Sequence, residues 1–208
     1  MSDSTLRRYT NIPALIHLLT EQKITLLDPQ SWDDKNDSRY LDIYRQKKGL
    51  ASVLALCFTQ AGESYHHWRV FADGSSGVCI QFAKSPLIKA VKSEVRVRTG
   101  AVRYLKLKEL REAPPRIHEL SFLKRFAFEH EKEFRMICES RDQRRATLDV
   151  AIPLSTIDRI TLSPWLDQNL ATPLRHALKS IKGCSNVEIV RSTLIGNREW
   201  QEHGESAE

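Results

Sequence analysis

Two carboxylates and a guanidinium group alternate in the middle of the chain. The stretch FEHEKEFRMI, residues 128–137, places Glu131, Glu133 and Arg135 on every second position. In an extended segment such side chains project from one face. Two carboxylates this close repel each other, so one pKa should rise unless a cation such as Arg135 neutralises them. Glu131 and Glu133 are either a structural Glu–Arg ladder on a sheet or a catalytic pair that holds a substrate hydroxyl and orients a nucleophile.

A second acidic group lies in the loop SWDDKNDS, residues 31–38. It contains several carboxylate and amide side chains: Asp33, Asp34, Asn36 and Asp37. Such residues favour turns because their side chains bond to nearby backbone groups. Together with Glu131 and Glu133, Asp37 could instead ligate Mg²⁺ for phosphodiester cleavage. A metal-dependent nuclease is therefore one open alternative.

Trp68 follows two adjacent histidines, His66 and His67. Adjacent histidines point in different directions on a helix, so they do not form a metal-binding pair. One of them could act as a general base near neutral pH. We expect Trp68 to anchor the core, with a platform for base stacking as the alternative.

The elements that position these residues indicate one mixed α+β domain over residues 1–200, with a polar tail at 201–208. We expect a mixed sheet of about eight short strands with flanking helices. The expected strands include residues 5–10, 23–28, 52–60, 77–83, 94–104 and 133–140, with two more in 147–164 and a last one near 186–194. The expected helices follow residue 11 and cover 39–48, 116–130 and 166–183, with short ones after 83 and 106.

The composition is typical of a folded soluble protein, with 41% hydrophobic and 28% charged residues in a chain of 208. No apolar run reaches the roughly 18 to 20 residues that cross a bilayer. The first ten residues contain no apolar segment of a secretory signal, so we expect a cytoplasmic protein without a membrane partner.

Positive charge is concentrated in residues 89–111, which are rich in Lys and Arg, and the whole chain has a net charge of +6. Charge runs usually form a solvated face. The alternative is a surface that contacts the phosphates of a nucleic acid. A non-catalytic module that binds nucleic acid or protein is thus a further open reading.

Four motifs occur in a recognisable order. They are RRYT with a helix and KITLLDPQSWDDKND, the strand ending CFT, YHHWRVFADGSSGVCIQF, and KRFAFEHEKEFRM with ITLSPW and VRSTLIG behind it. From about residue 6 to 196 this order resembles the bacterial family called domain of unknown function 2971. The chain departs from its pattern at Ser38, Phe71 and Phe134, which stand in place of Pro, Tyr and Trp. Members are often met near phage-defence genes, which implies an effector or sensor but no particular reaction.

The order of a basic strand, helix, strand, loop and late acidic strand also resembles the ADP-ribosyltransferases, which hold NAD in a split α+β sheet. The resemblance implies an NAD-using enzyme, acting on nucleic acid, with Glu133 as the catalytic carboxylate and Glu131 as its partner. It implies cofactor contacts from four further residues: Arg8, Tyr9, Thr10 and Thr59. The carboxylates would stabilise an oxocarbenium-like state, as in glycoside cleavage. Without such a role, Arg7 and Arg8 would simply protect an exposed strand edge.

Overall fold

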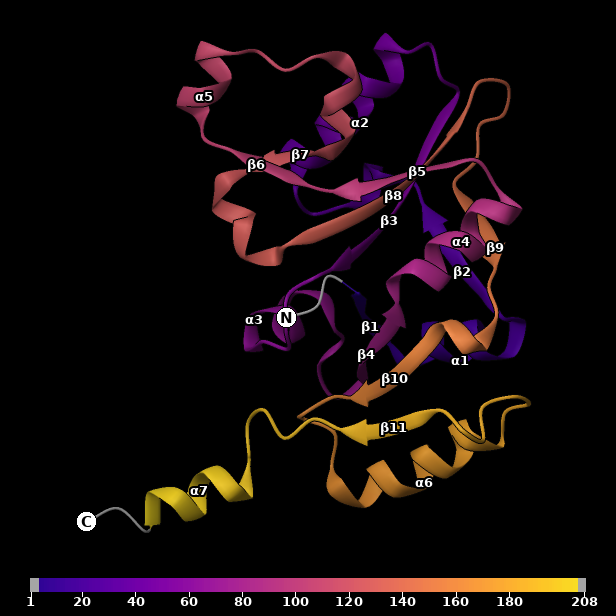
Figure 1. Cartoon of the computed structure of the whole chain (residues 1–208), viewed down its shortest axis with the longest axis vertical. Coiled ribbons are helices and arrows are strands. Elements are labelled where there is room, and N and C mark those ends of the chain that lie inside the picture. The colour runs from indigo at the N-terminus through magenta and orange to yellow at the C-terminus, as the bar shows by residue number, and fades with distance from the viewer. Residues whose placement is uncertain (1–3, 206–208) are drawn as a thin grey trace.

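A mixed sheet forms the centre of the molecule (Figure 1). The structure is a computed structural model that describes residues 4–205. Within that range nine strands join one sheet: β1 (Thr5–Asn11), β2 (Lys23–Leu27), β3 (Ser52–Thr59), β4 (Gly77–Ala83), β5 (Val97–Ala101), β8 (Glu133–Ser140), β9 (Thr147–Ala151), β10 (Ile157–Leu162) and β11 (Glu188–Arg191). A separate parallel pair consists of β6 (Arg103–Leu105) and β7 (Leu123–Arg125). The prediction of a single mixed α+β domain is confirmed.

Helices and short 3-10 segments connect these strands. The α-helices are α1 (Ile12–Glu21), α2 (Lys35–Lys47), α3 (Tyr65–Phe71), α4 (Lys84–Glu94), α5 (Leu107–Glu112), α6 (Gln168–Ser180) and α7 (Arg198–Glu205). The 3-10 segments are η1 (Pro29–Ser31), η2 (Gly74–Ser76), η3 (Ile117–Phe122), η4 (Phe126–Glu131) and η5 (Leu154–Thr156). In the described part of the chain, no helix is both long and apolar enough to span a membrane.

The sheet divides along β3. Strand β1 pairs with β4 over its full length, but it pairs with β3 at Arg7, which lies opposite Thr59. Strand β2 meets β3 at Leu27 opposite Ala55. On its other edge β3 pairs with β8 from Ser52 to Thr59. The sheet therefore opens along one edge of β3, between β1 and β2, as expected for a split sheet.

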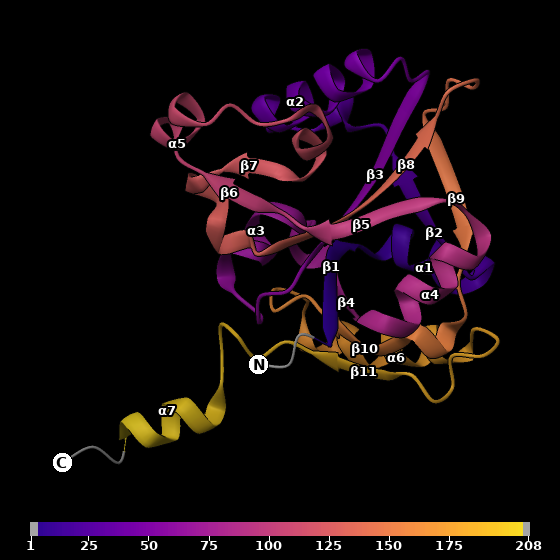
Figure 2. The same cartoon turned by 45° about the horizontal axis from the view of Figure 1, so that its top comes forward.

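Apolar residues cover both faces of β3, as its uninterrupted apolar sequence predicts. The larger core cluster lies under α1, α4 and α6 and includes Leu54, Leu56 and Phe58. A smaller cluster packs α2 against the other face through Tyr44 and Ala55. Figure 2 shows α2 and α4 on opposite sides of β3 and β8. This strand is consequently a rigid support for whatever lies along its open edge.

Helix α2 begins at Lys35, four residues earlier than predicted. The reason is a cap: the Asp34 side chain accepts hydrogen bonds from the backbone N–H groups of Asn36 and Asp37. Asn36 and Asp37 therefore belong to the first turn of a helix, and not to the loop in which we expected them.

The helix expected at residues 116–130 is wrong. The segment consists of η3, strand β7 and η4. Leu123 and Lys124 pair with Arg103 and Tyr104 of β6, a contact between distant segments that the local spacing of apolar residues does not reveal. This difference places Lys124 on a strand. At the C-terminus, residues 201–205 of the expected polar tail belong to the exposed helix α7, and residues 206–208 lie outside the described range.

Candidate active site

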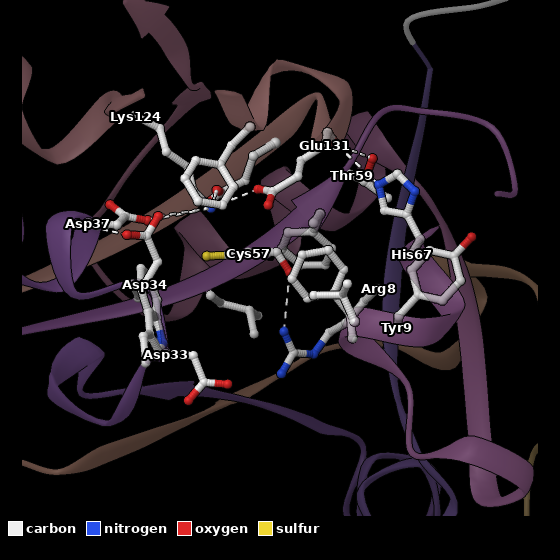
Figure 3. A pocket seen from close by; sticks show the side chains of 18 of the residues that line it. Arg8, Tyr9, Asp33, Asp34, Asp37, Cys57, Thr59, His67, Lys124 and Glu131 are labelled. Atoms are coloured by element: carbon white, nitrogen blue, oxygen red, sulfur yellow. Dashed lines mark hydrogen bonds and ion pairs between the residues drawn. The ribbon is translucent and has the colours of Figure 1, made fainter. Parts of the chain in front are cut away.

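A cleft of about 620 Å³ lies along the open edge of β3 (Figure 3). One wall is the β1 segment Arg7–Tyr9, and the floor is the β3 segment Ala55–Thr59. The remaining walls come from the segment from η1 to α2, from α3, β7 and η4, and from the start of β8. Their lining residues include Trp32, Asp33, Asp34, Asp37, His67, Phe71, Lys124, Phe128, Glu131 and Glu133. The volume lies within the range of roughly 300 to 1,000 Å³ that is usual for small-molecule sites.

Two arginines of β1 form the basic wall. Arg8 Nη1 donates a hydrogen bond to the carbonyl of Cys57 at 3.1 Å, across the opening between β1 and β3. Arg7 Nη1 donates to the carbonyl of Ala61 at 2.9 Å. Tyr9 continues this wall, and its ring stacks on His67 with 5.4 Å between ring centroids. The β1 side of the cleft is therefore cationic and aromatic.

The carboxylates of Glu131 and Glu133 form the acidic wall. Contrary to the expectation, the two residues do not alternate along one strand. Glu131 ends η4, and Lys132 has a left-handed backbone (φ 44°, ψ 49°) before β8 begins at Glu133. Both carboxylates nevertheless reach Lys124 Nζ, at 2.7 Å for Glu131 and 3.4 Å for Glu133. Lys124 is a site residue that the sequence reasoning missed, because it fell inside the helix expected at 116–130.

Arg135 is the second cation of this wall, and its side chain is fully buried. Its Nε donates to Glu133 at 2.7 Å, and its two terminal nitrogens donate to both oxygens of Asp37 at 3.0 and 2.6 Å. This bidentate geometry is the strongest form of such a pair. The expected neutralisation of Glu133 by Arg135 is present, whereas Glu131 is paired with Lys124.

The two carboxylates differ in their proton affinity. Burial raises the pKa of Glu131, although the ion pair with Lys124 opposes this. Burial would also raise the pKa of Glu133, but Arg135 and Lys124 outweigh it and lower that pKa to about 2. The pair thus contains one carboxylate that is firmly ionised and one that gains a proton more readily.

Hydrogen bonds to their backbone groups hold Glu131 and Glu133 in place. The Thr59 hydroxyl donates to the carbonyl of Glu131 at 2.5 Å, and His67 Nε2 lies 3.4 Å from the same oxygen. The hydroxyl of Tyr104 accepts the backbone N–H of Glu133 at 2.7 Å. Thr59, expected to contact a cofactor, lines the cleft but uses its hydroxyl to hold the Glu131 segment.

The structure brings most of the predicted site residues together, since Arg8, Tyr9, Thr59, Asp37, Glu131 and Glu133 all line the cleft. Four other candidates are not among the described lining residues: Thr10, Asn36, Trp68 and Arg135. Asn36 is exposed on α2. Trp68 is fully buried and donates from Nε1 to Glu63, which confirms its role as a core anchor.

The magnesium alternative finds no support in the arrangement of the described residues. Among them no group of three or more His, Cys, Asp or Glu is placed to hold a metal ion. Asp37, Glu131 and Glu133 are instead paired with Lys124 or Arg135.

The basic segment 89–111 does not form one continuous element. It spreads over α4, β5, β6 and α5, and α4 and α5 lie on different sides of the molecule in both views (Figures 1 and 2). Within it, Arg98 and Arg103 are paired with Glu139 and Glu119. Nucleic-acid binding through this segment stays a prediction.

Comparisons with known proteins give a fold-level likeness. No protein-family model matches the chain, so membership of domain of unknown function 2971 stays a prediction, and no curated protein matches either. A solved structure of Thermus sp. 2.9 DarT in complex with NAD+ is similar, with 12% identity and a TM-score of 0.47 over 92% of this chain and 96% of that one. The same protein in complex with ADP-ribosylated ssDNA gives 13% identity and a TM-score of 0.46 over 91% and 94%. A likeness of this size assigns neither a ligand nor a reaction to this chain.

Proposed function

We propose that this protein uses NAD as a substrate and transfers its ADP-ribose group at the cleft described above. The observation that supports this is the placement of Arg8, Glu131 and Glu133 around one cavity. NAD combines an anionic pyrophosphate with a glycosidic bond to nicotinamide. Guanidinium groups suit the phosphates, and carboxylates suit the positive charge that develops when a glycosidic bond breaks.

Glu133 is the proposed catalytic carboxylate. Its low pKa keeps it anionic at neutral pH, so it can stabilise an oxocarbenium-like state without first losing a proton. One of its oxygens is held by Arg135, and the other faces Lys124 at the cleft. Glu131, whose pKa is raised, suits the second role of accepting a hydrogen bond or proton from a sugar hydroxyl. Two carboxylates with diverging proton affinities can divide such roles between them.

The proposed cofactor contacts lie on the opposite wall. Arg8 uses one guanidinium N–H for the Cys57 carbonyl, and a guanidinium has five N–H donors in total. Tyr9, Phe71 and Phe128 supply aromatic surface for the flat rings of NAD. We propose a nucleic acid as the acceptor, in keeping with the net charge of +6, and a role in phage defence as the family resemblance implies.

The test is to incubate the purified protein with NAD, alone and with single-stranded DNA or RNA. Loss of NAD, release of nicotinamide and the mass of the nucleic acid are measured. We expect Glu133→Gln to lower the rate by at least about 10²-fold, the usual effect of removing one preorganised electrostatic group. Glu129→Gln is the matched control, because Glu129 is exposed and belongs to the same segment.

Intact NAD with every acceptor, or a Glu133→Gln variant as active as the wild type, would refute the proposal. Nucleic-acid cleavage that a chelator abolishes would replace it with a nuclease. Salt-sensitive binding of nucleic acid without any turnover of NAD would replace it with a binding module.

A further inference from the structure

Lys124 lies at the centre of the acidic wall. Its ammonium group is within 4.0 Å of four carboxylates: Glu131 at 2.7 Å, Glu133 at 3.4 Å, Asp37 at 3.8 Å and Asp34 at 4.0 Å. The side chain of Lys124 is only 8% exposed. A lysine is rarely this buried unless it is paired.

The two cations of the wall divide the carboxylates between them. Arg135 holds Asp37 with two hydrogen bonds and takes one oxygen of Glu133. Lys124 takes the other oxygen of Glu133 and the side chain of Glu131. Among the ion pairs of the described residues, Lys124 is the cation that faces Glu131. Without it, Glu131 would be a buried carboxylate beside another anion, the situation that favours protonation.

Lys124 contacts the segment that directly follows it and also the start of α2, which lies far earlier in the chain. Strand β7 carries it to the end of η4 and the start of β8. The Asp34 oxygen at 4.0 Å, Oδ2, is buried and has no hydrogen-bond partner, since the cap of α2 uses the other oxygen. The ring of Phe128 lies 4.8 Å from Nζ and covers it. Lys124 is therefore fixed in place and shielded from solvent.

We propose that Lys124 is a positioning residue for the reaction proposed above, and the inference rests on that function. Its ammonium group holds Glu131 and Glu133 side by side at the cleft and keeps Glu131 a carboxylate. Glu131 then accepts a hydrogen bond or proton from the substrate at a pH where it would otherwise be a carboxylic acid.

The charge state of Glu131 depends on every ionisable group that faces it or Lys124. These groups are Lys124, Glu133 and His130 around Glu131, and Asp34 and Asp37 around Lys124, with Arg135, Cys57 and Tyr104 next to Glu133. Removing Lys124 leaves the anions Glu133, Asp37 and Asp34 in place. The loss therefore shifts Glu131 in one direction, towards its protonated form.

The experiment combines a titration with a pH–rate profile. The carboxyl carbons of ¹³C-labelled glutamates are followed by NMR from about pH 3 to about pH 9 in the wild type and Lys124→Met, with Glu131→Gln for assignment. We expect the Glu131 titration in Lys124→Met to move up by about 1 to 3 pH units. The acid limb of NAD consumption should move by the same amount. Lys124→Arg should restore both, and Arg125→Met, an exposed neighbour, should change neither.

An unchanged Glu131 titration in Lys124→Met would overturn the inference, whatever the rates. If Lys124→Met fails to fold, Lys124→Gln removes the charge with a polar side chain, and the same titration decides. The titration needs no substrate, so it separates the two proposals. A shift of Glu131 in a protein that leaves NAD intact would support the positioning contact and refute the reaction.

Discussion

Replacing Arg135 with methionine should strongly destabilise the protein. The guanidinium is fully buried and is the partner of Glu133 and Asp37, which are themselves buried. Methionine fills a similar volume but removes the hydrogen-bonded guanidinium from both carboxylates and leaves them Lys124 alone, at 3.4 Å from Glu133 and 3.8 Å from Asp37. Breaking a buried ion pair on one side typically costs about 3 to 5 kcal/mol, because the remaining charge stays desolvated.

The lowered pKa of Glu133 leads to a similar free energy. That pKa lies at about 2 instead of its ordinary value of 4.5. At about 1.4 kcal/mol for each pKa unit, this net lowering, which Arg135 and Lys124 produce against the cost of burial, corresponds to about 3 kcal/mol of stability at neutral pH. In a domain of this size, a loss of about 3 to 5 kcal/mol lowers the melting temperature by roughly 6 to 20 °C.

The assay is urea and thermal unfolding at pH 7, followed by circular dichroism. Arg159→Met is the matched control, since Arg159 Nε contacts Glu188 at 2.8 Å but both side chains are about half exposed. Such a surface pair contributes about 0 to 1 kcal/mol. If Arg135→Met costs no more than Arg159→Met, the reasoning about this buried pair is wrong.

The pH dependence provides a second check on Arg135. A carboxylate with a lowered pKa stabilises the fold above its unfolded value, about 4.5 for Glu133, and this contribution is lost as the pH falls towards 2. In Arg135→Met the carboxylates of Glu133 and Asp37 have lost their guanidinium partner and protonate more readily. The variant therefore loses less stability than the wild type when the pH falls. The difference in the free energy of unfolding should therefore narrow between about pH 5 and pH 2.

Two further predictions concern hydrogen bonds at and beside the acidic wall. Tyr104→Phe removes the hydroxyl that accepts the Glu133 backbone N–H, and should lower the free energy of unfolding by about 1 to 3 kcal/mol in urea titrations; an unchanged stability would mean that water replaces the hydroxyl. His66 and His130 share a hydrogen bond of 2.8 Å between their Nε2 atoms, and burial together with His130 lowers the pKa of His66. A histidine whose pKa is lowered in the folded protein destabilises the fold once the pH falls below about 6.5, its pKa in the unfolded chain. The wild type should therefore lose more stability from pH 7.5 to 5.5 than His130→Gln. Equal losses in both proteins would contradict this.

Local sequence patterns predicted several elements well. The apolar run that ends in MIC predicted β8 at residues 133–140 to its last residue, and α1 begins directly after residue 11 as expected, with Asn11 as its cap. These elements follow from side-chain period and local capping, which act over a few residues. The alternation of charged residues drew attention to Glu131 and Glu133, and the resemblance to ADP-ribosyltransferases implied Arg8. All three line the cleft.

The predictions that were wrong or missing concern features that depend on contacts between distant segments. Lys124 was assigned to a helix because its strand exists only through pairing with β6. The Asp37–Arg135 pair joins residues 98 positions apart, and no local pattern signals it. The left-handed turn at Lys132 was missed because a glycine or asparagine usually marks such a backbone, and this chain has a lysine there. Tertiary contacts therefore decide the geometry of the acidic wall.

The central position of β1 has a consequence for how the protein folds. Arg8 belongs to the first described strand, but that strand lies between β3 and β4. The facing carboxylates Glu131 and Glu133 arrive only with the end of η4 and the start of β8. Pairings this distant in sequence form slowly, because a long loop must close before any contact compensates for its lost entropy. A nascent chain consequently carries the basic wall long before the acidic one. The two walls can face each other only after β8 has left the ribosome and paired with β3.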